Sequence, residues 1–267
     1  MHEAEPAPSA PTDIEWAGKS VLAVTPHPDD ESLALGGLIQ HALRHGASVT
    51  LLQITDGDNN PWPQRWLERR WRIGPEARAR WGQRRVGEAQ QAMQCLGLPA
   101  ASLHRLRWPD LGVCARLRDD GTGAIEAFAA VMRHTQPDIV VLPALEDRHP
   151  DHGGAHVLAR LAMARLSREP DCLAYLVHGS GAPAGDPFVL SLDTVMQQTK
   201  RQAVLAHHTQ VALARRRLLA MVTPEERLYR LPATTSARPS AVLSLPWHPS
   251  RYLHPWLQLT VAHADGV

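Results

Sequence analysis

Four side chains that can bind cations or transfer protons follow an uncharged segment near the start of this 267-residue sequence. They are His27, Asp29, Asp30 and Glu31. Residues 21–24 before them are all apolar, which is typical of a strand buried on both faces of a sheet. Carboxylates and an imidazole beside a dry strand are electrostatically unfavourable unless a bound cation or proton chemistry compensates them. We therefore interpret this segment as a site for cation binding or acid–base chemistry rather than as a solvated turn.

A second cluster of the same residue types follows another apolar run, residues 139–142. It contains His149, Asp151 and His152. Open α/β sheets bind ligands beyond the carboxyl ends of their strands, so we expect the two clusters to converge at one sheet edge. Two imidazoles and one carboxylate form a common catalytic zinc set that leaves a position open for water. A further carboxylate and imidazole would then serve proton transfer and oxyanion stabilisation.

The elements that must position these clusters alternate along the chain. Hydrophobic runs predict strands at residues 20–25, 49–54, 103–108, 138–143, 172–177 and 188–192. Helical patterns cover residues 32–45, 76–96, 124–134, 153–165 and 194–207. This order predicts an α/β fold, a Rossmann-like three-layer αβα sandwich with a mostly parallel sheet. Gly36 and Gly37 disfavour a helix, so we expect another element to pack closely against them.

Length and composition indicate one domain. Residues 1–19 are expected to form a flexible lead-in and residues 20–267 a single α/β domain. Within it we distinguish a core of about 20–180, an insertion at 58–82 and a loop-rich C-terminal part at 185–267. The net charge of +1 favours neither nucleic acid nor membrane surfaces as partners. Three scattered cysteines and the lack of a membrane-spanning run or signal peptide predict a cytoplasmic protein without a membrane span.

The insertion is rich in aromatic and basic residues. Its four tryptophans and six arginines are Trp62, Trp66, Trp71, Trp81, Arg65, Arg69, Arg70, Arg72, Arg78 and Arg80. Trp offers a flat face to a sugar or base, and Arg offers a fork for phosphate, so Trp62 and Arg65 are candidate substrate contacts. The alternative is an amphipathic lid helix whose Trp side chains point inward and whose Arg side chains point outward.

Two motifs carry a family resemblance. Pro-His-Pro-Asp-Asp-Glu at residues 26–31 and His-Pro-Asp-His at residues 149–152 resemble the LmbE/PIG-L family of zinc-dependent N-acetylglucosaminyl deacetylases. Thr-Asp-Gly at residues 55–57 and Arg-Arg at residues 84–85 are also similar, and the resemblance covers about residues 20–180. It implies a zinc-dependent N-deacetylase that removes the acetyl group from an N-acetylated amino sugar or its conjugate.

The resemblance also implies roles for single residues. Zinc, or another divalent metal such as Fe²⁺, would be held by His27, Asp30 and His152. Asp29 would act as general base on the zinc-bound water, and His149 would polarise the acetyl oxygen. These roles suit amide hydrolysis, because zinc lowers the pKa of its bound water to about 7. Asp151 is expected to hydrogen-bond His149 and keep it protonated.

Substrate contacts are less constrained by the sequence. Arg85 and Asp110 are candidate partners for sugar hydroxyls, and His178 is a candidate pocket residue. The density of Arg and Trp in the insertion predicts a substrate larger and more anionic than free N-acetylglucosamine. Nucleotide- and polyprenyl-diphosphate sugars are the leading candidates. His207 is expected to lie on the surface.

Two other functions compete with this interpretation. Another metal-dependent hydrolase, such as a phosphoesterase, also uses carboxylates after strands, but the sequence shows no second complete ligand set for a two-metal site. A non-catalytic α/β ligand-binding module is disfavoured because no Gly-x-Gly-x-x-Gly turn follows the first strand. The particular sugar, the native metal and the oligomeric state are left open by the sequence.

Overall fold

The computed structural model describes residues 14–179, 181 and 183–233 of the chain. Its strands are β1 (Ser20–Thr25), β2 (Ser48–Thr55), β3 (Leu103–Trp108), β4 (Ile139–Pro143), β5 (Asp171–Tyr175), β6 (Asp186–Ser191) and β7 (Glu225–Leu231). Its α-helices are α1 (Asp30–Leu33), α2 (Gly36–Arg44), α3 (Pro61–Glu68), α4 (Pro75–Cys95), α5 (Val113–Asp119), α6 (Gly121–Thr135), α7 (Pro150–Met163), α8 (Thr194–Ala206) and α9 (His208–Leu219). A 3₁₀ turn, Ala100–Ser102, precedes β3.

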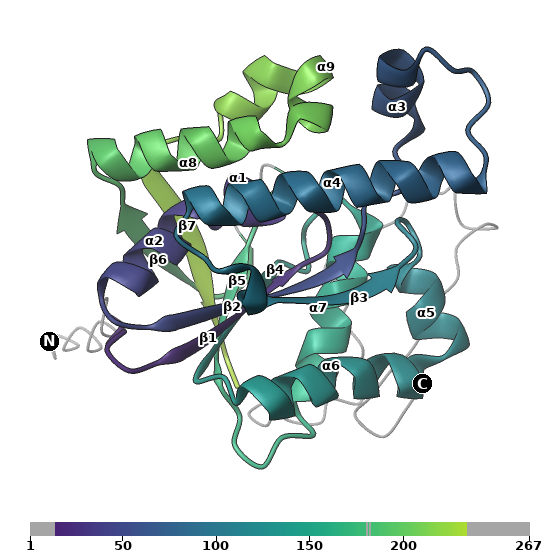
Figure 1. Cartoon of the computed structure of the whole chain (residues 1–267). Coiled ribbons are helices and arrows are strands. Elements are labelled where there is room, and N and C mark those ends of the chain that lie inside the picture. Colours follow the sequence, from purple (N-terminus) through teal and green to yellow (C-terminus); the bar gives the residue numbers. More distant parts are fainter. Residues whose placement is uncertain (1–13, 180, 182, 234–267) are drawn as a thin grey trace, which may run out of the picture.

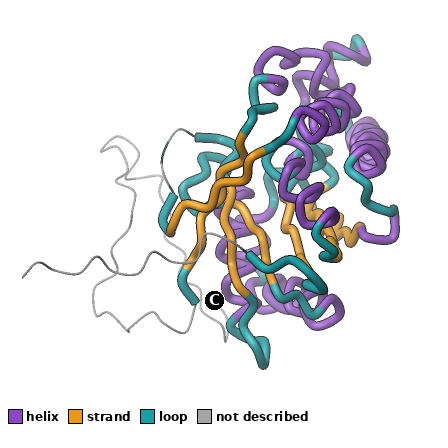
Figure 2. The backbone as a smooth tube through the Cα atoms, turned by 90° about the vertical axis from the view of Figure 1, so that its left-hand side faces the viewer, coloured by secondary structure: helices purple, strands orange, loops and turns teal. Residues whose placement is uncertain are grey.

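The strands form one sheet in the order β3-β2-β1-β4-β5-β7-β6. Strands β1 to β5 are parallel, and β7 pairs antiparallel with both β5 and β6. Helices α2, α4 and α8 lie on one side of the sheet and α5, α6 and α7 on the other (Figure 1). Figure 2 shows the sheet twisting between them. The predicted three-layer α/β fold is confirmed.

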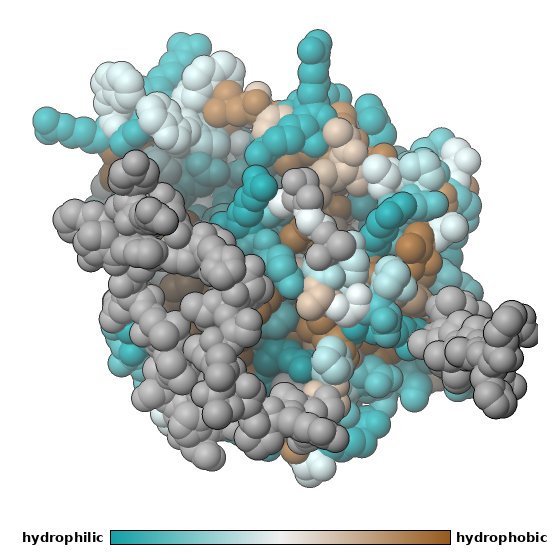
Figure 3. Space-filling model, turned by 180° about the vertical axis from the view of Figure 1, so that it is seen from behind, coloured by the Kyte–Doolittle hydropathy of each residue, from teal (hydrophilic) through white to brown (hydrophobic). Residues whose placement is uncertain are grey.

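The central strand β1 supplies both hydrophobic cores because its side chains alternate across the sheet. Val21 and Ala23 belong to the core under α2, α4 and α8. Leu22 and Val24 belong to the core under α6 and α7. On the face seen from behind in Figure 3, the visible described residues present apolar side chains as small patches among polar ones. The sheet is therefore covered on both sides.

The sheet order places a switch point at β1. The chain leaves β1 toward β2 on one side and returns later to β4 on the other, and both strands pair with β1. Loops at such a point diverge and leave a crevice at the carboxyl edge. The segments after β1 and after β4 are the two that carry the predicted chemical residues.

Three expectations about local structure were wrong. The helix expected at 32–45 is interrupted, and α1 and α2 are separate. In the segment expected to be loop-rich, residues 208–219 form α9 and residues 225–231 form β7. Trp16 is buried and packs in the core, so the ordered domain begins within the expected lead-in. Residues 1–13 and 234–267 of the two terminal segments lie outside the described residues.

The close packing expected at the two glycines is confirmed. A Cβ atom on Gly36 would lie 2.9 Å from the side chain of Lys200, and one on Gly37 would lie 2.8 Å from that of Glu226. The Glu226 carboxylate accepts hydrogen bonds from the backbone N–H groups of Gly37 and Leu38. It also forms a buried ion pair with Lys200 at 2.7 Å. This contact joins the first turn of α2 to α8 and β7.

Replacing Glu226 by Ala should lower the free energy of unfolding by about 3–5 kcal/mol. The reason is that the variant leaves the buried Lys200 ammonium without its partner and removes the acceptor for two N–H groups. Urea denaturation measures the change, with the exposed neighbour Glu225→Ala as the control. A loss below about 1 kcal/mol, the value for surface pairs, would show that this contact does not hold α2.

Candidate active site

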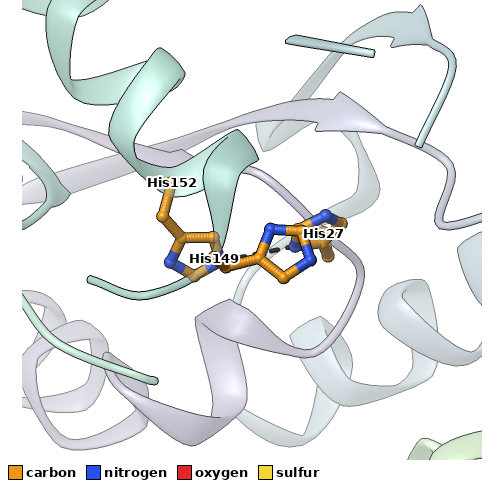
Figure 4. Close-up of side chains that lie close together, drawn as sticks. All are labelled: His27, His149 and His152. Carbon is orange, nitrogen blue, oxygen red and sulfur yellow. Dashed lines mark hydrogen bonds between the residues drawn. The ribbon is translucent and has the colours of Figure 1, made fainter. Parts of the chain in front are cut away.

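The two predicted clusters converge at the switch point of the sheet. His27 lies in the loop after β1, and Asp30 is the first residue of α1. His149 is the N-cap of α7, and His152 lies in its first turn. Figure 4 shows the imidazoles of His27, His149 and His152 pointing toward one another. Pro28 and Pro150 fit this arrangement, because proline ends a ladder and is accepted at the first position of a helix.

Three donor atoms from these segments lie at similar distances from one another. His27 Nδ1 lies 3.3 Å from His152 Nε2 and 3.6 Å from Asp30 Oδ2. His152 Nε2 lies 3.5 Å from the same carboxylate oxygen. A tetrahedral zinc ion with bonds of about 2.0–2.1 Å holds its ligand atoms about 3.3–3.4 Å apart. The residues therefore fit a zinc ion bound by two imidazoles and one carboxylate.

The other nitrogen of His27 is directed to two carboxylates. Nε2 lies 3.2 Å from Asp110 Oδ1 and 3.3 Å from Asp151 Oδ2. These three residues form one possible metal-binding group, and His27, His149 and His152 form another. However, both oxygens of the Asp151 carboxylate accept backbone N–H groups, from Leu111 and Val113, whereas Asp30, within the described part of the chain, accepts only that of His27, at Oδ2. We therefore assign Asp110 and Asp151 as partners that orient the His27 ring and leave Nδ1 free to bind a metal.

His152 is oriented in the same way. Its Nδ1 lies 3.1 Å from Asp147 Oδ2, so a carboxylate faces one ring nitrogen while the other faces the donor cluster. Burial disfavours a charged imidazole, but the charge of Asp30 and the contact with Asp147 raise the pKa of His152 to about 9. Asp147 also accepts the backbone N–H of His178, whose ring lies 5.2 Å from that of His152. No role for Asp147 was predicted from the sequence.

Asp29 has an unusual backbone and a partly buried carboxylate. Its φ of 127° is rare for a residue with a side chain. Burial, opposed by the nearby charge of Arg85, raises the pKa of Asp29 to about 6. Arg85 Nη2 lies 3.3 Å from Asp29 Oδ2 and donates to the carbonyl of Pro28, while Nη1 donates to that of Gly57. Gly57 has a φ of 65°, and a Cβ there would overlap the guanidinium. Arg85 thus holds the loops together.

Glu31 connects this loop to the C-terminal part of the chain. One oxygen of Glu31 accepts the N–H of Asp29, and the other lies 2.7 Å from His207 Nε2. Ser32 Oγ contacts both the carboxylate and the imidazole. All three side chains are buried. The expectation that His207 is a surface residue was wrong, because its partner is 176 positions away and leaves no local pattern.

His149 differs from its expected state. The Asp151 carboxylate hydrogen-bonds His27, Leu111 and Val113, and only the backbone N–H of Asp151 donates to His149 Nδ1. Burial and the charges of His27 and His152 lower the pKa of His149 to about 4. The expectation that Asp151 keeps His149 protonated was therefore wrong. A neutral ring that accepts at Nδ1 carries its proton on Nε2 and can donate it in a hydrogen bond.

A cavity of about 430 Å³ opens onto these groups. Its lining includes His27, Asp29, Asp30, Asn59, Asn60, Trp62, Arg85, Asp110, His149, His178, Gln210 and Arg217. Of the predicted substrate contacts, Trp62 and His178 thus line it, whereas Arg65 lines a neighbouring hollow. Arg85 and Asp110 also line the cavity. The Nη1 and Nη2 atoms of Arg85 donate to backbone carbonyls, and Asp110 Oδ1 faces His27. Helix α9 was not predicted from the sequence, so Gln210 and Arg217, which lie on it, were missed as cavity residues. Val211 and Leu218 have helical spacing and could have indicated this helix.

Fold and site define an α/β protein with a cluster of His and Asp side chains, of the types that can bind a metal, at the carboxyl edge of its sheet. The family profile described as GlcNAc-PI de-N-acetylase (PIG-L) matches residues 22–163. The chain therefore belongs to the PIG-L family. No helix in the described part of the chain is both long and apolar enough to span a membrane.

Among curated proteins, the chain is similar to the 1D-myo-inositol 2-acetamido-2-deoxy-alpha-D-glucopyranoside deacetylase of Saccharomonospora viridis. The two are 33% identical over 161 residues, which are 54% of this chain and 58% of the relative. The chain thus spans less than two thirds of the length of this relative.

Solved structures share the fold. N,N'-diacetylchitobiose deacetylase from Pyrococcus horikoshii has a TM-score of 0.63 and 18% identity, covering 80% of this chain and 84% of its own. The 4-carboxy-2-hydroxymuconate hydratase GalB from Pseudomonas putida KT2440 has a TM-score of 0.60 and 21% identity, covering 85% and 100%. Because a deacetylase and a hydratase both share this architecture, the fold does not decide the reaction.

The buried contact between Glu31 and His207 should contribute strongly to stability. His207→Ala leaves the Glu31 carboxylate buried without its cationic partner, so the free energy of unfolding should fall by about 3–5 kcal/mol. The adjacent and exposed His208 provides the matched control, since His208→Ala should change it by less than about 0.5 kcal/mol. Equal urea midpoints for the two variants would contradict the assignment.

Proposed function

We propose that the protein is a metal-dependent hydrolase that removes the acetyl group from an N-acetylated amino sugar or its conjugate. The observation that carries the proposal is the convergence of His27 Nδ1, Asp30 Oδ2 and His152 Nε2 within 3.3–3.6 Å. Asp29 and His149 line the same cavity as His27 and Asp30. Membership of the PIG-L family and the name of the S. viridis relative favour acetamide hydrolysis over phosphate-ester hydrolysis.

The metal is proposed to be zinc, with Fe²⁺ as the alternative. A mixed set of two imidazoles and one carboxylate suits either ion, and both are bound by His/carboxylate sites in proteins. When bound, the ion supplies Lewis acidity: it lowers the pKa of water and polarises a carbonyl oxygen.

In this proposal Asp29 moves the proton. Its carboxylate takes a proton from the attacking water and delivers it to the nitrogen of the leaving amine. Burial and the pKa of about 6 suit this role, since a base of that pKa is ionised at neutral pH and still accepts a proton readily. The contact with Arg85, and the hydrogen bond from the Asp29 backbone N–H to Glu31, fix the Asp29 carboxylate relative to the cavity.

His149 stabilises the developing negative charge. With Nδ1 held by the backbone N–H of Asp151, the ring presents its Nε2–H to the acetyl oxygen. A preoriented donor of this kind strengthens as the carbonyl oxygen becomes an oxyanion. The role differs from the cationic imidazole expected from the sequence, because the neutral ring donates without carrying charge.

The substrate is proposed to be an N-acetylglucosamine-type sugar attached to an anionic group. Asn59, Asn60 and Gln210 line the cavity and can hydrogen-bond sugar hydroxyls. Arg217 also lines the cavity and can pair with phosphate or carboxylate. We also propose a cytoplasmic location, which the three free cysteines support.

Metal analysis tests the ligand set. The purified protein should carry about one zinc ion per chain, and His152→Ala should remove it, because one of three protein ligands is lost. The exposed His134→Ala serves as the control and should keep full occupancy. Undiminished zinc in the His152 variant would mean that the ion binds elsewhere.

Activity assays separate proton transfer from metal binding. Asp29→Asn keeps the shape of the side chain but removes the base, so acetate release should fall by roughly 10²–10⁴-fold while zinc is retained. His149→Ala should lower turnover by roughly 10²–10³-fold, also with zinc retained. Near-parental turnover in both variants would refute this division of roles, even with zinc present.

A further inference from the structure

The insertion after β2 exposes most of its aromatic surface. Trp62, Trp66 and Trp71 are 65%, 63% and 80% exposed, whereas Trp81 of the same insertion is buried. The alternative of a lid helix with inward Trp side chains is therefore wrong for three of the four. Large aromatic side chains grouped on a surface mark binding sites more often than isolated ones do.

These three side chains and Leu213 of α9 form a hollow of about 390 Å³, here called the tryptophan cup. Helices α3 and α9 are in contact and lie side by side (Figure 1). They supply Trp62, Trp66 and Leu213 to the cup, whereas Trp71 follows α3 in the chain. Trp62 lines the cup and also the cavity that His27 and Asp30 line. The two spaces are therefore neighbours that share one wall. Their volumes are each of the size that holds a small-molecule group.

Positive charge surrounds the cup. Residues 62–81 contain six Arg and two Glu, a net charge of +4, so the remainder of the chain carries −3 of the total of +1. Arg65 lies with its guanidinium 5.3 Å from the centre of the Trp62 ring and donates to the Trp71 carbonyl. Arg69 and Arg70 also line the cup, and within the described residues neither forms an ion pair. An anionic group at the rim would find unpaired partners.

We propose that the tryptophan cup is a subsite for the aglycone of the substrate, and that it takes a flat apolar group, such as an aryl ring, next to a phosphate or carboxylate. The inference rests on the proposed deacetylase function and deepens it. Flat rings stack on Trp, and guanidinium forks bind oxyanions. The shared wall at Trp62 lets one molecule place its acetamide near Asp29 and its aglycone in the cup.

The test compares three substrates that differ only in the aglycone: N-acetylglucosamine, its phenyl β-glycoside and its 4-carboxyphenyl β-glycoside. Acetate release gives KM and kcat for each. The parent enzyme should show the lowest KM for the carboxyphenyl compound. Trp66→Ala and Trp71→Ala should each raise the KM of both aryl glycosides by about tenfold relative to that of the free sugar. Trp66→Phe should restore most of the difference, because a flat ring is retained.

Charge is tested separately. Arg70→Glu should raise the KM of the carboxyphenyl glycoside by about tenfold more than that of the phenyl glycoside, since only the first carries a carboxylate. Val195→Ala is the control, because Val195 is also exposed, at 60%, but lies on α8 outside the cup. It should leave all three KM values unchanged.

Binding of the product amines distinguishes failure of the subsite from failure of the reaction. Phenyl β-glucosaminide should bind the parent more tightly than glucosamine in calorimetry, and Trp66→Ala should abolish the difference. If no substrate releases acetate but this difference is seen, the proposed reaction is wrong and the subsite stands. Equal affinities for the two amines overturn the subsite. The subsite is also overturned if the cup variants change only dimerisation or only binding to anionic lipid vesicles. The surface would then belong to an interface with a second copy or with a membrane, respectively.

Discussion

The site depends on the way one imidazole is shared between two sets of carboxylates. His27 directs Nε2 to Asp110 and Asp151 and Nδ1 to Asp30 and His152. Burying so many ionisable groups is unfavourable unless every charge has a partner. Since the first two carboxylates occupy Nε2, the ring is fixed in orientation and Nδ1 faces the donor set that fits a zinc ion. Both sets would lose their geometry if this ring turned.

The fold supplies these partners from distant parts of the chain. The switch point of the sheet brings together the loops after β1 and β4, and the family match at residues 22–163 includes both. Two supports of the α1 and α2 segments come from beyond that match. His207 holds Glu31, and Glu226 caps α2 and pairs with Lys200. The C-terminal elements of the described chain therefore stabilise a site whose reactive groups they do not supply.

Hydrophobic periodicity and turn residues sufficed to predict the parallel strands. Apolar runs such as residues 139–142, and the prolines after them, are local signals. The convergence of the two clusters followed from the parallel topology. What could not be predicted were contacts between residues far apart in sequence. The hydrogen bonds from the Nη1 and Nη2 atoms of Arg85 to backbone carbonyls, for example, leave no local signal in the sequence. The partner of His207 was hidden for the same reason. Strand β7 was missed because charged residues interrupt the hydrophobic pattern of Glu225–Leu231. Its conformation is decided by its pairing with β5 and β6.

The central claim is that the metal binds on the Nδ1 side of His27, and the most direct test is an anomalous diffraction map of zinc-loaded crystals. The account predicts one strong peak within about 2.0–2.2 Å of His27 Nδ1, Asp30 Oδ2 and His152 Nε2. A peak between His27 Nε2, Asp110 and Asp151 would contradict it. In that case the residues assigned here to orient the ring would be the ligands, and Asp29 and His149 would need other roles.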